Sequence, residues 1–116
     1  MHYNDKAHFW RREMELNTSY QNKTLYITLR GEIDEHTAGR NRREADKLAQ
    51  TYVDCTTVVF DLKDVSFMDS TGIGFLIGRY KTFQRMGVPC YLANVSPVTD
   101  RILSISGIYA LMPKLQ

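Results

Sequence analysis

A chain of 116 residues with 43% hydrophobic residues is long enough for one core and too short for two. Its formal charge of +2 is too small to indicate a nucleic-acid-binding face, and no apolar run approaches the roughly 18 residues that span a membrane. We therefore expect one cytoplasmic domain, monomeric or weakly dimeric, with no direct contact to nucleic acid or membrane.

The N-terminal residues 1–12 mix charged and aromatic side chains without a regular period. We expect residues 1–13 to form an extension and residues 14–116 to form the domain. The extension is interpreted as a disordered segment, as a segment folded back over its own aromatic side chains, or as a partner-binding arm.

Two stretches of alternating apolar residues, 14–20 and 25–29, flank the polar residues 21–23 and predict a β-hairpin. Gly31 is expected to end the second strand. A helix is expected over roughly residues 36–51, with a thin apolar stripe.

The N-cap of this first helix is expected to be Asp34 or Thr37. The helix carries three arginines near its start, followed by acidic residues, and this mixture indicates a solvated face. These charged residues are Arg40, Arg42, Arg43, Glu44 and Asp46.

The uninterrupted apolar run Val58–Phe60 predicts a central strand that is buried on both faces and ends in acidic residues. After a short connection, Asp69 and Ser70 precede a second stripe with helical spacing. This stripe consists of Ile73, Leu76, Ile77, Tyr80 and Phe83, and the helix is expected to run to about Met86, before Gly87.

Ser70 is therefore placed at or beside a helix start, where backbone N–H groups lack intrahelical partners and the helix dipole is positive. Its hydroxyl could cap the helix, or it could carry a phosphate, which this position tolerates.

Glycines lie at positions 72, 74 and 78 of this helix and each costs roughly 1 kcal/mol relative to alanine. Close packing on the sheet is the expected reason for Gly78. For Gly72 and Gly74, packing and close approach of a second protein to Ser70 are equally good explanations.

The C-terminal part predicts a strand over residues 88–93, a helix from Ser96-Pro97 to Gly107, and a last strand over 108–112. The buried side of the helix is expected to be formed by Ile102, Leu103 and Ile105. The order β-β-α-β-α-β-α-β predicts an α/β fold with a mixed, mostly parallel sheet.

The sequence matches none of the catalytic and metal-binding motifs compared with it. Asp69-Ser70-Thr71-Gly72 has one residue too many for an aspartic protease, and the glycine spacing from Gly72 to Gly78 fits neither a dinucleotide fingerprint nor a P-loop. Met68 stands where a nucleophile elbow needs glycine. The spacing of Cys55, Cys90 and the histidines indicates no disulfide or metal site, so we expect no enzyme activity and no cofactor.

Glu32, Asp34 and His36 follow the second strand and could lie near the Ser70 loop. They could supply an acid and a base. Capping and solvated loop residues are the more common outcome, and contact with a partner is the functional alternative.

The segment Phe67-Met68-Asp69-Ser70-Thr71-Gly72-Ile73-Gly74, together with Gly31-Glu32-Ile33-Asp34, His36-Thr37-Ala38 and Gly78-Arg79-Tyr80, resembles the bacterial anti-sigma factor antagonists of the STAS family, in particular those of sporulation. Ser96-Pro97 and Ser106-Gly107 extend the resemblance, which covers roughly residues 14–112. It implies the STAS fold.

The resemblance also implies a partner-switching cycle in sigma factor regulation. In that family the unphosphorylated antagonist binds an anti-sigma factor, which is also a serine kinase, and thereby frees the sigma factor. The kinase phosphorylates the serine that matches Ser70, and a serine phosphatase resets the antagonist. The partner-binding surface would contain Ser70 and its neighbours Glu32, Asp34, His36, Asp69, Thr71, Gly72 and Gly74.

A phosphate on Ser70 would lie beside Asp69. The next arginine downstream, Arg79, is roughly 13 Å away along the helix, beyond a Debye length of about 8 Å. We therefore expect a lost interface with little refolding. The alternatives are a STAS scaffold that is not controlled by phosphorylation, and a small nucleotide-binding or hydrolytic protein.

Overall fold

The structure is a computed structural model that describes residues 13–115. It contains four strands, four α-helices and one 3-10 helix in this range. In chain order they are β1 (Glu15–Gln21), β2 (Thr24–Ile33), α2 (Ala38–Asp46), α3 (Leu48–Thr51), β3 (Thr57–Met68), α4 (Ser70–Arg85), β4 (Cys90–Ala93), α5 (Pro97–Ser106) and the 3-10 helix η1 (Ile108–Ala110).

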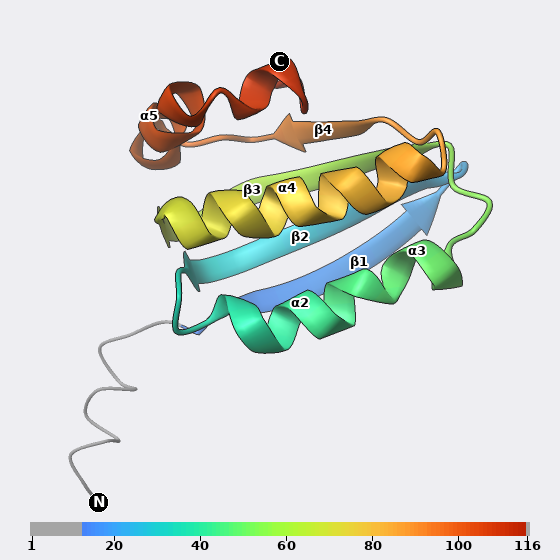
Figure 1. The fold of residues 1–116 in the computed structure, drawn as a ribbon, viewed down its shortest axis with the longest axis horizontal. Helices are drawn as coiled ribbons and strands as arrows, with labels where there is room; N and C mark the ends of the chain where they lie inside the picture. The colour runs from blue at the N-terminus through green and yellow to red at the C-terminus, as the bar shows by residue number, and fades with distance from the viewer. Residues whose placement is uncertain (1–12, 116) are drawn as a thin grey trace, which may run out of the picture.

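The strands form one sheet in the order β1-β2-β3-β4, with β1 antiparallel to β2 and the other pairs parallel. The predicted mixed, mostly parallel sheet is confirmed. Because β2, β3 and β4 run in the same direction, their carboxyl ends meet at one edge, on the left in Figure 1, which we call the C-terminal edge.

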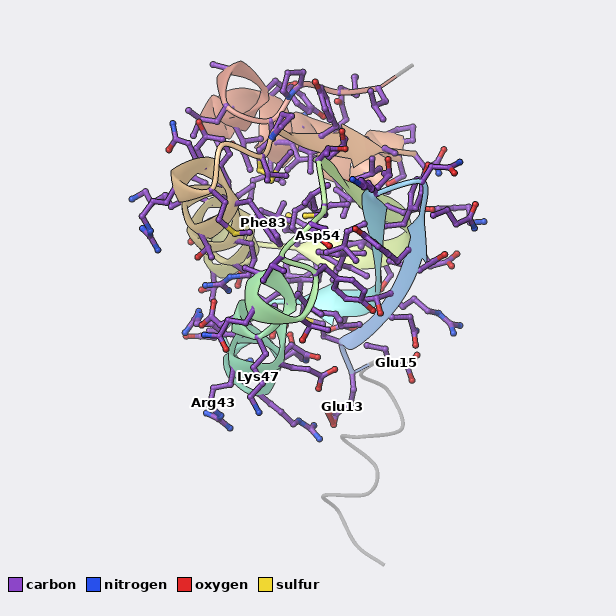
Figure 2. All side chains as sticks on the ribbon, turned by 90° about the vertical axis from the view of Figure 1, so that its right-hand side faces the viewer. Glu13, Glu15, Arg43, Lys47, Asp54 and Phe83 are labelled. Atoms are coloured by element: carbon purple, nitrogen blue, oxygen red, sulfur yellow. The ribbon has the colours of Figure 1, made fainter. Side chains whose placement is uncertain are left out.

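The helices α2, α3 and α4 lie on one face of the sheet, and Figure 2 shows the two layers edge-on. Phe83 points from α4 toward the sheet, whereas Arg43 and Lys47 point away from α2. Alternate residues of β2 are buried, as expected for a strand with one covered face, and they pack on buried aromatic side chains of β3 and α4. These aromatic residues are Phe60, Phe75 and Phe83.

The predicted hairpin is confirmed. Asn22 and Lys23 have φ angles of 52° and 63°, as a two-residue type I′ turn requires. Strand β1 is nevertheless largely exposed, because it is an edge strand of the sheet. Leu16 is its one partly buried residue.

Several predicted boundaries differ from the structure, and the strand predicted over residues 88–93 begins only at Cys90. Strand β2 continues past Gly31 to Ile33, and Gly31, at φ 90°, lies at a bulge in the pairing with β3. Strand β3 continues through its acidic residues to Met68, so no separate connection precedes Asp69. The predicted first helix is interrupted at Lys47 and forms α2 and α3.

The last predicted strand, over residues 108–112, is wrong. Ile108–Ala110 form a 3-10 helix, and both Ile108 and Met112 are buried. Beyond it, an isolated parallel bridge joins Leu92 of β4 to Lys114. A short apolar run bounded by Gly107 and Pro113 fits a strand or a helical turn equally well, and here the turn buries Ile108 and Met112 while Leu111 stays 40% exposed.

Candidate functional site

Helix α4 begins at Ser70 and is capped by the residue before it. The Asp69 carboxylate accepts hydrogen bonds from the backbone N–H groups of Thr71 (2.9 Å) and Gly72 (3.2 Å). Ser70 is exposed, and its hydroxyl makes no hydrogen bond with residues 13–115. The interpretation of Ser70 as a capping serine is therefore wrong, because Asp69 has that function.

The backbone around Asp69 is tied to the neighbouring strand. Asp69 has extended dihedral angles and its N–H donates to the carbonyl of Ile33 at 3.3 Å. Met68, directly before it, pairs with Ile33 in the parallel ladder. Strand β3 therefore passes into α4 without a loop, and the position of Ser70 follows from the sheet.

Gly72 allows the first turn of α4 to lie close to the end of β2, because it has no side chain. A Cβ atom at this position would lie 2.8 Å from the Ile33 carbonyl oxygen and 2.5 Å from Met68 Cγ. Gly74 and Gly78 face open space, so the expectation that Gly78 packs on the sheet is wrong. Close packing on the sheet therefore explains the glycine at position 72. It does not explain Gly74, which is exposed.

The loop after β2 is organised by Asp34. This side chain is buried, and its Oδ1 accepts hydrogen bonds from the backbone N–H groups of His36 (2.9 Å) and Thr37 (3.2 Å). Thr37 is the N-cap of α2 by position, but its hydroxyl donates to the Glu32 carbonyl at 2.8 Å and caps no helical N–H. Asp34 therefore shapes the loop, while His36 is exposed, with Nδ1 3.7 Å from Asp34 Oδ1.

The two loops meet because β2 and β3 are neighbours. Glu32 pairs with Phe67, three residues before Ser70, and Gly72 touches Ile33. Of the eight site residues predicted from the sequence, Asp34 and Gly72 are buried beneath this region and the others are exposed or half-buried. We call these six the Ser70 surface: Glu32, His36, Asp69, Ser70, Thr71 and Gly74.

Arg79 is directed away from this surface. Its side chain is 8% exposed and pairs with Asp46 of α2 at 3.0 Å, and its guanidinium lies 5.1 Å from the centre of the Phe75 ring. Burial lowers the pKa of Arg79, and the Asp46 charge partly opposes that shift. Arg79 thus links α2 to α4 and supplies no cation to Ser70.

Two residues lie in surroundings that the sequence pattern does not predict. Asn41, between Arg40 and Arg42, is buried and donates to the carbonyls of Met14 (3.3 Å) and Thr37 (3.2 Å). Ile105 was expected on the buried side of α5, yet it is 76% exposed. Val98, Ile102 and Ile105 follow one another at helical spacing, which was the available signal for a second apolar stripe on α5.

Between residues 13 and 115 no cluster of His, Cys, Asp or Glu side chains could hold a metal ion. In the same range no helix has the length and apolar character needed to cross a membrane.

The fold agrees with one protein family. The STAS domain model matches residues 15–116, and the chain belongs to this family. The fold predicted from the sequence is thereby confirmed.

Two bacterial relatives are similar over most of their length. The anti-sigma F factor antagonist of Paenibacillus polymyxa is 33% identical over 100 residues, which cover 86% of this chain and 85% of the relative. The anti-sigma-B factor antagonist of Bacillus subtilis is 34% identical over 84 residues, covering 72% and 74%.

Among solved structures, the anti-sigma factor antagonist SpoIIAA in its unphosphorylated form superposes with a TM-score of 0.69 and 26% identity, over 89% of this chain and 88% of SpoIIAA. The phosphorylated form of SpoIIAA, described as a Bacillus cell fate determinant, superposes with a TM-score of 0.64 and 27% identity, over 89% and 91%.

Proposed function

We propose that this chain is an anti-sigma factor antagonist that is controlled by phosphorylation of Ser70. Unphosphorylated, it binds an anti-sigma factor with serine kinase activity through the Ser70 surface and releases the sigma factor. Phosphorylation ends this binding, and a serine phosphatase restores it. The protein is a substrate in this cycle, acts in the cytoplasm and catalyses nothing.

The observation that carries the proposal is the position of the Ser70 hydroxyl. It is exposed, it has no hydrogen-bond partner between residues 13 and 115, and it is not needed to cap α4. The open space at Gly74 leaves room for a docking kinase along the same turn. A hydroxyl in this setting can accept the γ-phosphoryl group of ATP, with ADP as leaving group, without loss of a structural bond.

The physical effect of the phosphate follows from its surroundings. It adds about −1.5 to −2 charge beside the Asp69 carboxylate, while the positive end of the helix dipole contributes roughly 0.3–2 kcal/mol in the opposite direction. Arg79 is already paired with Asp46. We therefore expect the fold to stay unchanged and the partner to be repelled by charge and bulk.

The names of the relatives support the class of partner and leave the pathway open. They include antagonists described for both anti-sigma F and anti-sigma-B factors. The proposal therefore covers sporulation and stress-type pathways alike, with residues 14–116 as the regulatory domain and residues 1–13 as an extension.

The test uses Ser70→Ala as bait in the source bacterium and then the purified, captured anti-sigma factor. With ATP, wild type should gain the mass of one phosphate on the peptide that contains Ser70, and Ser70→Ala should gain none. Ser70→Ala should bind and resist release, whereas Ser70→Asp should bind at least about tenfold more weakly, or about 1.4 kcal/mol.

Ser19→Asp is the matched control, because it adds the same charge to an exposed serine of β1. It should bind as wild type does, and all variants should keep the wild-type melting temperature. Wild-type affinity of Ser70→Asp would contradict the switch, and an anti-sigma factor that binds but leaves Ser70 unmodified would favour the scaffold alternative.

A further inference from the structure

A groove beside the Ser70 surface is lined by apolar side chains and one arginine. It has a volume of about 340 Å³ and lies between the end of β3 and helix α5. Figure 1 shows α5 near the N-terminal end of α4, at the C-terminal edge of the sheet. We call it the β3–α5 groove, and its lining residues are Phe67, Met68, Val98, Arg101, Ile102 and Ile105.

The groove exposes more apolar surface than the fold requires. Phe67 is 46% exposed, Val98 69% and Ile105 76%. Three of the nine large hydrophobic side chains that are exposed between residues 13 and 115 thus gather at one place. Scattered exposed apolar residues are ordinary, but a contiguous patch with a charged rim is typical of an interaction site.

The apolar stripe of α5 that lines the groove is mostly distinct from the residues buried in the core, and Ile102 both lines the groove and packs against the core. Val98, Ile102 and Ile105 have the spacing i, i+4, i+7 and share one face of the helix. Thr99 and Leu103 are buried on another face. Beside the face buried in the core, helix α5 therefore carries an apolar face on which residues 13–115 leave Val98 and Ile105 exposed.

The groove is continuous with the Ser70 surface. Phe67 and Met68 are the last two residues of β3, directly before Asp69 and Ser70. Met68 lies on the first turn of α4, since its Cγ would be 2.5 Å from a Cβ on Gly72. A protein that covers Ser70 is thus adjacent to the groove, and a single interface can include both.

The charge of the groove indicates the chemistry of its occupant. Arg101 is exposed and forms no ion pair with any residue from 13 to 115. The acid beside it, Asp100, is occupied by the Tyr109 hydroxyl at 2.6 Å and the Lys114 ammonium at 3.1 Å. The groove therefore offers apolar contact and one cation that lacks a counter-charge.

We propose that the β3–α5 groove receives an apolar segment of the anti-sigma factor, and that a carboxylate next to this segment pairs with Arg101. This inference rests on the proposed function and extends the interface from the phosphorylation site to α5. It also adds to the switch, because a phosphate on Ser70 places negative charge next to a surface that binds a carboxylate.

The test measures the dissociation constant of the unphosphorylated chain with the purified anti-sigma factor captured above. Val98→Asp and Ile105→Asp should each weaken binding by at least about tenfold, and Arg101→Glu by about fivefold to tenfold with a reduced salt dependence. Val53→Asp is the matched control. Val53 is also an exposed apolar residue, at 63%, but it precedes β3 at the opposite edge of the sheet, so its substitution should leave binding unchanged.

The outcomes separate the two proposals. If wild type neither binds an anti-sigma factor nor is phosphorylated at Ser70, the proposed function fails and this inference falls with it. If wild type binds and is phosphorylated while Val98→Asp and Ile105→Asp bind as tightly as Val53→Asp, the groove proposal alone is overturned.

A second copy of the chain is the competing occupant, and sedimentation tests it. A wild-type dimer that Ile105→Asp dissociates, together with unchanged anti-sigma factor binding, would assign the groove to self-association and overturn the proposal. Circular dichroism melting of each variant should match wild type, because the substituted side chains are exposed.

Discussion

Two buried or half-buried carboxylates organise the ends of adjacent strands in the same way. Asp34 after β2 and Asp69 after β3 each accept two backbone N–H hydrogen bonds through Oδ1. Unpaired N–H groups at such positions would cost about 1–3 kcal/mol each if buried. The backbone beneath the Ser70 surface is therefore fixed internally, before any partner binds.

Gly72 adds a steric constraint at the same place, and its neighbour Gly74 provides the contrast. Gly72→Ala should destabilise the fold by about 1–3 kcal/mol, because the new methyl group meets the Ile33 carbonyl oxygen, a backbone atom that does not move easily. Gly74→Ala should instead stabilise it by roughly 0.5–1 kcal/mol, since the site is open and helical. Urea unfolding of the two variants measures the difference.

If both alanine variants raise the free energy of unfolding, the close approach of α4 to β2 is not a constraint. The same pair also tests the open alternative for the glycines. Should a partner contact the bare backbone at Gly74, Gly74→Ala will weaken binding while it stabilises the fold.

At the scale of elements, a hydrogen bond between two side chains joins α5 to η1. The Tyr109 hydroxyl of η1 donates to Asp100 of α5 at 2.6 Å. Burial and this bond to a carboxylate raise the pKa of Tyr109 above its ordinary value. The stability that Tyr109 contributes is therefore fully present below its unfolded pKa, about 10, and is lost as the pH rises through the higher folded-state pKa.

Tyr109→Phe should therefore be less stable than wild type at pH 8, and the difference between the two should shrink between pH 10 and pH 11.5. Denaturant unfolding of both proteins at several pH values measures this. Tyr91→Phe is the control for loss of a tyrosine hydroxyl, because the Tyr91 hydroxyl makes no hydrogen bond with residues 13–115 and its removal should cost less at pH 8 than removal of the Tyr109 hydroxyl. A constant difference for Tyr109→Phe would mean that the Tyr109 hydroxyl does not face Asp100.

The sequence predicts an element well where contacts between residues close in sequence determine it, and poorly where contacts between distant residues do. The start of α5 was predicted correctly because Ser96 caps it through Thr99 N–H, a contact three residues away. The 3-10 helix at Ile108 and the extension of β3 to Met68 were missed because tertiary packing and pairing with β2 decide them. Asn41 was missed for the same reason, since its acceptor Met14 is 27 residues away.

The site follows the same rule. The sequence placed Ser70 at a helix start, and the motif indicated its neighbours, since both depend on local order. That Gly72 and not Gly78 packs on the sheet depends on the distance to Ile33, which no local pattern contains. The Asp69 cap is a local contact with the N–H groups of Thr71 and Gly72, but Asp and Ser are both common N-cap residues, so the residue types alone do not decide between Asp69 and Ser70. The second apolar face of α5 was visible as spacing but its exposure depends on what the rest of the chain leaves uncovered.

For the whole molecule, the helical layer is held together by a contact between α2 and α4. Arg79 is nearly buried, and Asp46, half exposed, is its ion-pair partner. The Nε and Nη1 atoms of Arg79 have no hydrogen-bond partner among residues 13–115, and the guanidinium lies over the Phe75 ring. Removing one partner of such a pair is costly because a buried charge is left behind, whereas replacing the cation by an apolar side chain is often close to neutral.

Asp46→Ala should therefore destabilise the protein by about 1–3 kcal/mol, while Arg79→Met should remain within about 1 kcal/mol of wild type. Glu15→Ala, which removes the exposed pair with Arg30, is the control and should cost less than about 1 kcal/mol. Urea unfolding at pH 7 measures all three. A larger loss in Arg79→Met than in Asp46→Ala would show that Arg79 stabilises the layer by packing on Phe75.

Because Asp69 and not Ser70 caps α4, the Ser70 hydroxyl makes no hydrogen bond with residues 13–115 that a phosphate would break. In the proposed cycle, adding or removing the phosphate therefore requires no slow rearrangement of the helix. The protein would then have the same conformation at the start of each round of the proposed cycle. The duration of the signal is thereby set by the relative amounts and turnover of the kinase and the phosphatase.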